Sequence, residues 1–217
     1  MEKQEFKQVN EVILSGQVVR KFENDVACNL TIKTLRTNMP NITKAGDYSY
    51  NYPEVAFYDM VSKKNASEFK EGDFVEIKGQ IQPQRKTDPD TGREYYDQKI
   101  IGLKVSPAER ILNREFGYDE GDYVESQNMV KLGGVISKIS SPSKNVVLIN
   151  IITFAYGHVN NIQTVLYTRK PEQYISSLKL GDKIFAVGSV QTEKRTIKNG
   201  DNRYYKNVVL KAICKAE

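Results

Sequence analysis

Two segments of the sequence place basic residues beside a tyrosine pair, directly after a glycine-containing turn. DTGREYYDQKIIGLK runs from Asp90 to Lys104, and KNGDNRYYKNVVLKA runs from Lys198 to Ala212. Lys and Arg side chains contact phosphates with an affinity that depends on salt, and aromatic rings stack on exposed base faces. The two segments therefore predict contact with a flexible, unpaired polyanion.

The basic residues are concentrated in the C-terminal part of the chain. Residues 128–217 hold 14 Lys and Arg against 5 Asp and Glu, residues 8–105 hold 14 of each, and residues 106–127 hold 2 against 6. The net charge of the 217 residues is +5. A basic segment of this kind favours association with nucleic acid or another polyanion, and a merely soluble charged surface is the plainer alternative.

Other chemistries find little support in the sequence. His158 is the only histidine, so neither a zinc cage nor a Ser-His-Asp triad has enough candidates. DPDTG, from Asp88 to Gly92, lacks the closing Glu of a calcium loop and is better explained as a turn. Five scattered acidic residues in 128–217 do not resemble the clustered acids of a metal-dependent nuclease. We expect no catalysis, no metal and no cofactor.

The compartment is also bounded by the sequence. No secretory segment and no apolar run long enough to cross a bilayer is present, so we expect a cytoplasmic protein and no membrane. The two cysteines, Cys28 and Cys214, do not form a CxxC pair. Both have the parity of neighbouring apolar residues, which predicts two small core residues in a reducing compartment.

The chain repeats itself. FKEGDFVEIKGQIQPQRKT (Phe69 to Thr87) aligns with LKLGDKIFAVGSVQTEKRT (Leu178 to Thr196) at an offset of 109 residues, and the alignment continues to place the first Tyr-Tyr pair on the second. Upstream, Asn10 to Lys21 aligns with Asn128 to Ile139 at an offset of 118. The first copy thus has about nine extra residues, which we place in Asn38–Pro53. Two copies indicate tandem domains rather than a solenoid.

Each copy alternates apolar and polar residues with a period of two, interrupted by Gly-Asp turns, which predicts short strands. About 95 residues per copy fit a five-stranded barrel such as the OB-fold. ASEFK (Ala66 to Lys70) and PEQYISSLK (Pro171 to Lys179) predict a short helix between the third and fourth strands. We therefore expect an all-β protein with two tandem OB-fold domains, at 1–105 (copy one) and 128–217 (copy two), and an acidic linker at 106–127.

This order of elements resembles the bacterial single-stranded-DNA-binding protein family. It comprises Asn-x-Val-x-Leu-x-Gly, a strand with an aromatic residue, a helix, a Gly-Asp turn, an alternating strand, a basic hairpin with Tyr-Tyr and a last apolar strand, and both copies contain it. The resemblance implies OB-folds, binding of single-stranded DNA without sequence preference, no catalysis, and four OB-folds around one DNA, which two-domain members reach as homodimers.

The resemblance also implies which rings stack on bases. It places one aromatic before the third strand, at Tyr52 and Asn161, and one within that strand, at Tyr58 and Tyr167. The hairpin tryptophan of the family has no counterpart, and the chain ends in KAICKAE rather than in an acidic tail. These departures suggest an accessory, plasmid or phage-type relative.

The candidate binding residues combine both lines of reasoning. They are Tyr52, Tyr58, Arg85, Lys86, Arg93, Tyr96, Tyr167, Lys194, Arg195, Lys198, Arg203, Tyr205 and Lys206. The basic hairpin of copy two predicts tighter binding there, with copy one contributing mainly stacking or self-association. The second tyrosine of each pair should be the more exposed one, unless a bulge reverses the parity.

The predicted function is protection of single-stranded DNA in replication, recombination or mobile-element transfer. The alternatives left open are an OB-fold that binds proteins or drives oligomerisation, and an RNA binder.

Overall fold

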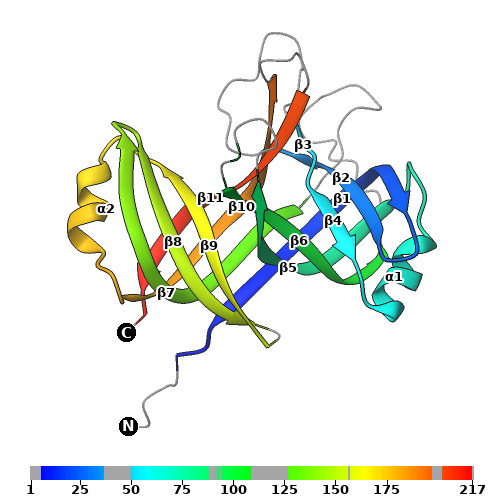
Figure 1. Cartoon of the computed structure of the whole chain (residues 1–217), viewed down its shortest axis with the longest axis horizontal. Helices are drawn as coiled ribbons and strands as arrows, with labels where there is room; N and C mark the ends of the chain where they lie inside the picture. The colour runs from blue at the N-terminus through cyan, green and yellow to red at the C-terminus, as the bar shows by residue number, and fades with distance from the viewer. Residues whose placement is uncertain are drawn as a thin grey trace, which may run out of the picture.

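Two closed β-barrels, joined along one strand pair, make up the protein (Figure 1). The computed structural model describes residues 6–36, 50–87, 92, 94–108, 127–155, 157–196 and 202–216. For 94–96, 194–196 and 202–204 it describes the backbone only. Most of the expected acidic linker, 109–126, lies outside the described residues.

Copy one closes its barrel in the order β1-β5-β6-β4-β2, with β2 returning to pair with β1. Antiparallel pairs make up the ladder except for β4 and β6, which run parallel. The strands are β1 (Val9–Glu23), β2 (Cys28–Leu35), β3 (Tyr50–Asn51), β4 (Glu54–Phe57), β5 (Phe74–Thr87) and β6 (Glu94–Pro107). The expected extra residues of this copy separate β2 from β3, and 37–49 lie outside the described residues.

Copy two repeats the same closure in the order β7-β8-β9-β11-β10, with β10 returning to β7. Its parallel pair is β9 with β11. The strands are β7 (Gln127–Ser143), β8 (Val146–Ala155), β9 (His158–Tyr167), β10 (Lys183–Thr196) and β11 (Asn202–Lys215). Each copy therefore has the five-stranded OB-fold topology that the repeated alternation predicted.

The two barrels meet where β1 pairs antiparallel with β7. Asn10 faces Leu132 while its counterpart Asn128 faces Leu14, so the pairing is symmetric about the Val12–Val130 pair. Each of these asparagines is bonded to the fourth barrel strand of its own copy: Asn10 to the backbone of Ile81, and Asn128 to that of Val190. Buried apolar residues of both barrels form one continuous core, because the shared sheet leaves no solvent layer between them.

A short helix follows the third barrel strand in each copy. Helix α1 spans Met60–Ser67, earlier than the expected Ala66–Lys70, because the Asp59 carboxylate accepts from the amides of Val61 and Ser62 and so starts the helix there. Helix α2 spans Pro171–Ser177 and begins at the expected proline.

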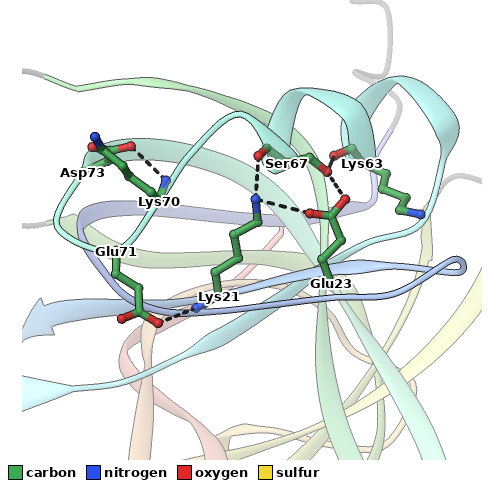
Figure 2. A network of polar contacts seen from close by, with 7 residues as sticks. All are labelled: Lys21, Glu23, Lys63, Ser67, Lys70, Glu71 and Asp73. Carbon is green, nitrogen blue, oxygen red and sulfur yellow. Dashed lines mark hydrogen bonds and ion pairs between the residues drawn. The ribbon is translucent and has the colours of Figure 1, made fainter.

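A polar network fixes α1 against the end of β1 (Figure 2). The Lys21 ammonium donates to the Ser67 carbonyl at 2.5 Å and pairs with Glu23 at 3.2 Å, and the Ser67 hydroxyl donates to Glu23. These hydrogen bonds lower the pKa of Glu23. The network involves the far end of β1 from the β1–β7 pairing, so it braces the barrel rather than the junction.

A bulge in the last strand of each copy corrects one expectation, the burial of Cys214. The pairing shifts between Lys78 and Gly79 and again between Val187 and Gly188, so parity reverses beyond these points. Cys28 is buried as expected, but Cys214 is exposed because it follows the bulge. The tyrosine pairs are also not equivalent: Arg85 faces Tyr96 whereas its counterpart Lys194 faces Tyr204, because the hairpin loop of copy two is one residue shorter.

Candidate nucleic-acid interface

A groove of about 690 Å³ runs across the junction of the two copies. Copy one supplies strands β1 to β6 of its walls, and copy two supplies one residue each from β10 and β11. The lining residues are Val19, Arg20, Thr31, Tyr50, Tyr52, Glu54, Lys86, Asp97, Thr192 and Lys206. A smaller hollow of about 260 Å³ shares Arg20, Thr31 and Glu54 with it and extends to Phe22, an exposed ring.

Tyr52 lies in the groove because strand β10 of copy two fixes its backbone. The Tyr52 amide donates to the Thr192 hydroxyl at 2.9 Å, and the Thr192 amide donates to the Asn51 side chain at 3.2 Å. Arg36 donates to the Thr192 carbonyl at 3.3 Å. The Tyr52 side chain is 43% exposed, so a flat ligand can reach its ring.

Opposite charges line this groove together. Arg20 is exposed and Lys206 comes from copy two, and the acids Glu54 and Asp97 line the same groove. Lys86 already forms an ion pair with Asp97, so part of its charge is neutralised before any ligand arrives. Asp97 therefore competes with a phosphate for the Lys86 ammonium.

Tyr58 stands just beyond β4 and is 40% exposed. The Lys99 ammonium donates to its hydroxyl and lies 4.7 Å from the ring centre, a cation–π contact. Burial, followed by repulsion from Lys206, lowers the pKa of Lys99.

The remaining predicted residues lie at the end of β9 and on the two hairpins, β5–β6 and β10–β11. Tyr167 ends β9 and is 58% exposed, Arg85 is exposed on β5, and Tyr205 is half-buried on β11. Outside the described residues lie Arg93 and Lys198, together with the side chains of Tyr96, Lys194, Arg195 and Arg203. The backbone pairing nevertheless sets Arg195 opposite Arg203 and Glu193 opposite Tyr205 in one hairpin.

The groove also contains residues that the sequence analysis did not select. Arg20 is one residue past the β1 bulge, where Val18 and Arg20 face consecutive residues of β2, so regular alternation would have misplaced it. Tyr50 belongs to the alternating Tyr48-Ser49-Tyr50-Asn51-Tyr52 run, a signal that was visible. Its ring is 4.1 Å from the Lys33 ammonium. Thr192 gave no signal, because its role depends on a contact between the copies.

The equivalent region of copy two is built differently. Register places Asn161 where copy one has Tyr52, and Gln163 where it has Glu54. Gln98 of copy one takes the place of Lys206 and donates to the Gln163 carbonyl. Tyr205 takes the place of Asp97. Copy two thus keeps a positive charge, Lys138, in the place of Arg20. It has no aromatic ring in the place of Tyr52.

Within the described ranges, no group of three or more His, Cys, Asp or Glu side chains is arranged to hold a metal ion. The same residues include no helix that is both long and apolar enough to span a bilayer.

Comparisons with known proteins complete the description. No protein-family model matches the sequence, and no curated protein matches it. Among solved structures, the wild-type single-stranded DNA binding protein from Thermus aquaticus matches with a TM-score of 0.65 and 11% identity, over 97% of this chain and 94% of that one. A deletion mutant of the same protein matches with a TM-score of 0.66 and 13% identity, over 97% and 96%. At this identity the likeness shows the fold: this chain has the tandem OB-fold of those proteins along nearly its whole length.

Proposed function

We propose that this protein binds single-stranded DNA without sequence preference, through phosphate contacts and base stacking. The observation that carries the proposal is the groove at the junction, which combines an exposed ring, Tyr52, with the cations Arg20 and Lys206. Unpaired strands offer both of the groups that such a groove recognises, because their bases are not stacked in a duplex. The solved structures of the same fold carry the name of single-stranded DNA binding proteins, which supports the same reading.

The binding surface that we propose extends from this groove onto both hairpins. It comprises Tyr52, Tyr58, Arg85, Lys86, Arg93, Tyr96, Tyr167, Lys194, Arg195, Lys198, Arg203, Tyr205 and Lys206, and the function requires no catalysis. We further propose domain limits at 1–105 and 128–217 with a linker between them, a cytoplasmic location, and an accessory, plasmid or phage-type role in replication, recombination or mobile-element transfer.

The experiment is a fluorescence-anisotropy titration with a dT oligonucleotide, a DNA duplex and an RNA of the same length, each at two salt concentrations. We expect the dT oligonucleotide to bind most tightly and its affinity to fall with salt, because each phosphate contact releases counterions. Stronger binding of the RNA would reassign the ligand, and absence of binding to all three would leave only the protein-binding alternative.

We also propose that the chain forms a homodimer that brings four OB-folds together. The outer face of β10 and β11 exposes Phe185, Val187 and Cys214, and the ring of Phe6 lies 5.2 Å from that of Phe185. Register puts Glu76 and Lys78 at the places of Phe185 and Val187 in copy one, so this face is apolar in only one copy. An exposed apolar face of this kind indicates a protein contact.

Light scattering coupled to gel filtration tests the dimer. We expect the wild-type protein to elute at twice the mass of the chain, and Phe185→Glu with Val187→Lys, which copies the charges of copy one, to elute as a monomer. A monomeric wild-type protein would contradict the dimer but not the binding of DNA.

A further inference from the structure

The contact between Thr192 and Tyr52 crosses from one copy to the other. Thr192 uses its amide, its hydroxyl and its carbonyl to bind three groups of copy one, and two of these are the neighbouring residues Asn51 and Tyr52. Strand β3 is only two residues long and pairs with β2 alone within its own barrel. Its position, and that of the ring that follows it, therefore depends on copy two (Figure 1).

We propose that Thr192 is a positioning residue for the base-stacking ring of Tyr52, so that one nucleobase-binding groove of this chain is assembled from both copies. This inference rests on the proposed function and adds the residue that orders its site. The ligand of the groove is a single nucleobase with its flanking phosphate, the base on Tyr52 and the phosphate toward Lys206 or Arg20. A ring held in place stacks at a lower entropic cost than a mobile one.

The repeat itself shows that the contact is specific to one copy. The counterpart of Thr192 is Pro83, which has neither an amide hydrogen nor a hydroxyl, and the counterpart of Tyr52 is Asn161. The equivalent pair, Pro83 and Asn161, therefore lacks both the hydroxyl and the ring. In the corresponding part of copy two, the Gln98 side chain donates to the carbonyl of Gln163.

The test uses Thr192→Val, which removes the hydroxyl but keeps the shape and the amide, and Thr192→Ser, which restores the hydroxyl. Affinity is measured for a dT oligonucleotide and for an abasic oligonucleotide of the same length, which carries phosphates but no bases. We expect Thr192→Val to weaken binding of dT by roughly threefold to fivefold, the size of one lost hydrogen bond. Binding of the abasic strand should not change, and Thr192→Ser should bind dT as the wild-type protein does.

A double-mutant cycle then asks whether Thr192 acts through the ring. Tyr52→Ala should weaken dT binding by about tenfold, in the range of one lost base stack. In that background Thr192→Val should add nothing, because the group that it positions is gone.

Three results would overturn the inference while leaving the proposed function intact. They are equal losses of dT and abasic binding in Thr192→Val, an unchanged affinity for dT, and additive effects in the cycle. If the wild-type protein bound neither strand, the proposed function would fail first. Thermal unfolding of each variant identifies a folding defect, and the Thr192→Ser rescue keeps the test decisive if Thr192→Val is unstable.

Discussion

Copy one and copy two share a framework but differ in the side chains at the positions of the groove. In each copy an asparagine of the first strand, Asn10 or Asn128, is hydrogen-bonded to the fourth strand. Each first strand also has a glycine at the same position, Gly16 or Gly134, and each last strand has a bulge. The groove walls differ: copy one has a ring on its third strand and an acid on its hairpin, whereas copy two has Asn161 and Tyr205 at these places. The two copies therefore share the residues that close a barrel and differ in the residues at the positions of the groove.

The difference suggests a division of labour between the copies. The hairpin of copy two contains five Lys and Arg residues close to its turn, and residues 128–217 as a whole are net positive. This charge favours contacts with phosphates. Copy one contributes the exposed ring and receives Thr192 and Lys206 from its neighbour. We therefore propose that charge and stacking come mainly from different copies and meet at their junction.

The largest expected effect concerns the shared framework. A Cβ at Gly16 would lie 2.3 Å from the Lys33 carbonyl oxygen, and a Cβ at its counterpart Gly134 would lie 2.2 Å from that of Ile152. Because the obstacle is backbone in both cases, Gly16→Ala and Gly134→Ala should each lower the free energy of unfolding by about 3 kcal/mol. Urea denaturation measures the change, with Gly72→Ala, where no atom is near, as a variant that tests strain at positive φ alone. A large loss at only one of the two glycines would break the equivalence of the barrels.

The next effect separates the two hairpins by charge. Arg195→Ala with Lys198→Ala in copy two should weaken binding of dT about tenfold and reduce the salt slope by about 1.4, two phosphate contacts at roughly 0.7 each. Arg85→Ala with Lys86→Ala in copy one should have a smaller effect, since Lys86 is paired with Asp97. Titrations at four salt concentrations give the slopes, and equal slopes for the two double variants would remove the proposed division of labour.

The fold could be predicted from the sequence because barrel closure depends on local, repeated signals. Alternation, Gly-Asp turns and Pro171 mark strands and a helix wherever they occur, and the repeat doubled each signal. The start of α1 at Asp59 was missed, since a cap is a single residue in a polar stretch. The position of the bulge in β11 was not predicted, and with it the exposure of Cys214. The partner of Tyr204 was missed because the hairpin loop of copy two is one residue shorter. An extra residue in one strand leaves no mark on composition.

The site was predictable only in part for a different reason. Tyr52, Lys86 and Lys206 were selected by residue type and resemblance, and all three line the groove. Arg20 and Thr192 were not, because nothing local distinguishes them from other strand residues. Arg20 is placed by the bulge in β1. Thr192 reaches the groove because the pairing of β1 with β7 brings β10 of one barrel against β3 of the other. A contact between repeats cannot be derived from either repeat alone.

A smaller effect is expected from building the missing contact into copy two. Pro83→Thr with Asn161→Tyr places both members of the Thr192–Tyr52 pair at their equivalent positions. If these residues account for the difference between the copies, affinity for dT should rise by roughly threefold, less than a full base stack because Gln98 still bridges to Gln163. Adding Gln98→Lys, as in the first groove, should raise it further. A graft that folds normally by thermal unfolding yet gains nothing would show that the copies differ for another reason.

The last prediction concerns the reactivity of the two thiols, one in each copy. Replacing either cysteine should leave the binding of DNA unchanged. Cys28 is buried in the barrel of copy one, and burial raises the pKa of its thiol, so little thiolate is present to react. Cys214 is exposed beyond the β11 bulge. A colourless disulfide reagent that releases a coloured thiol should therefore count one fast equivalent per chain in the native protein and a second only in denaturant. Cys214→Ser should abolish the fast phase and Cys28→Ser should spare it.

The same reaction also reports on the dimer. If the wild-type chain dimerises through the outer face of β10 and β11, the fast phase should slow as protein concentration rises, because the partner then covers Cys214. In the Phe185→Glu, Val187→Lys variant the rate of the fast phase should be independent of concentration.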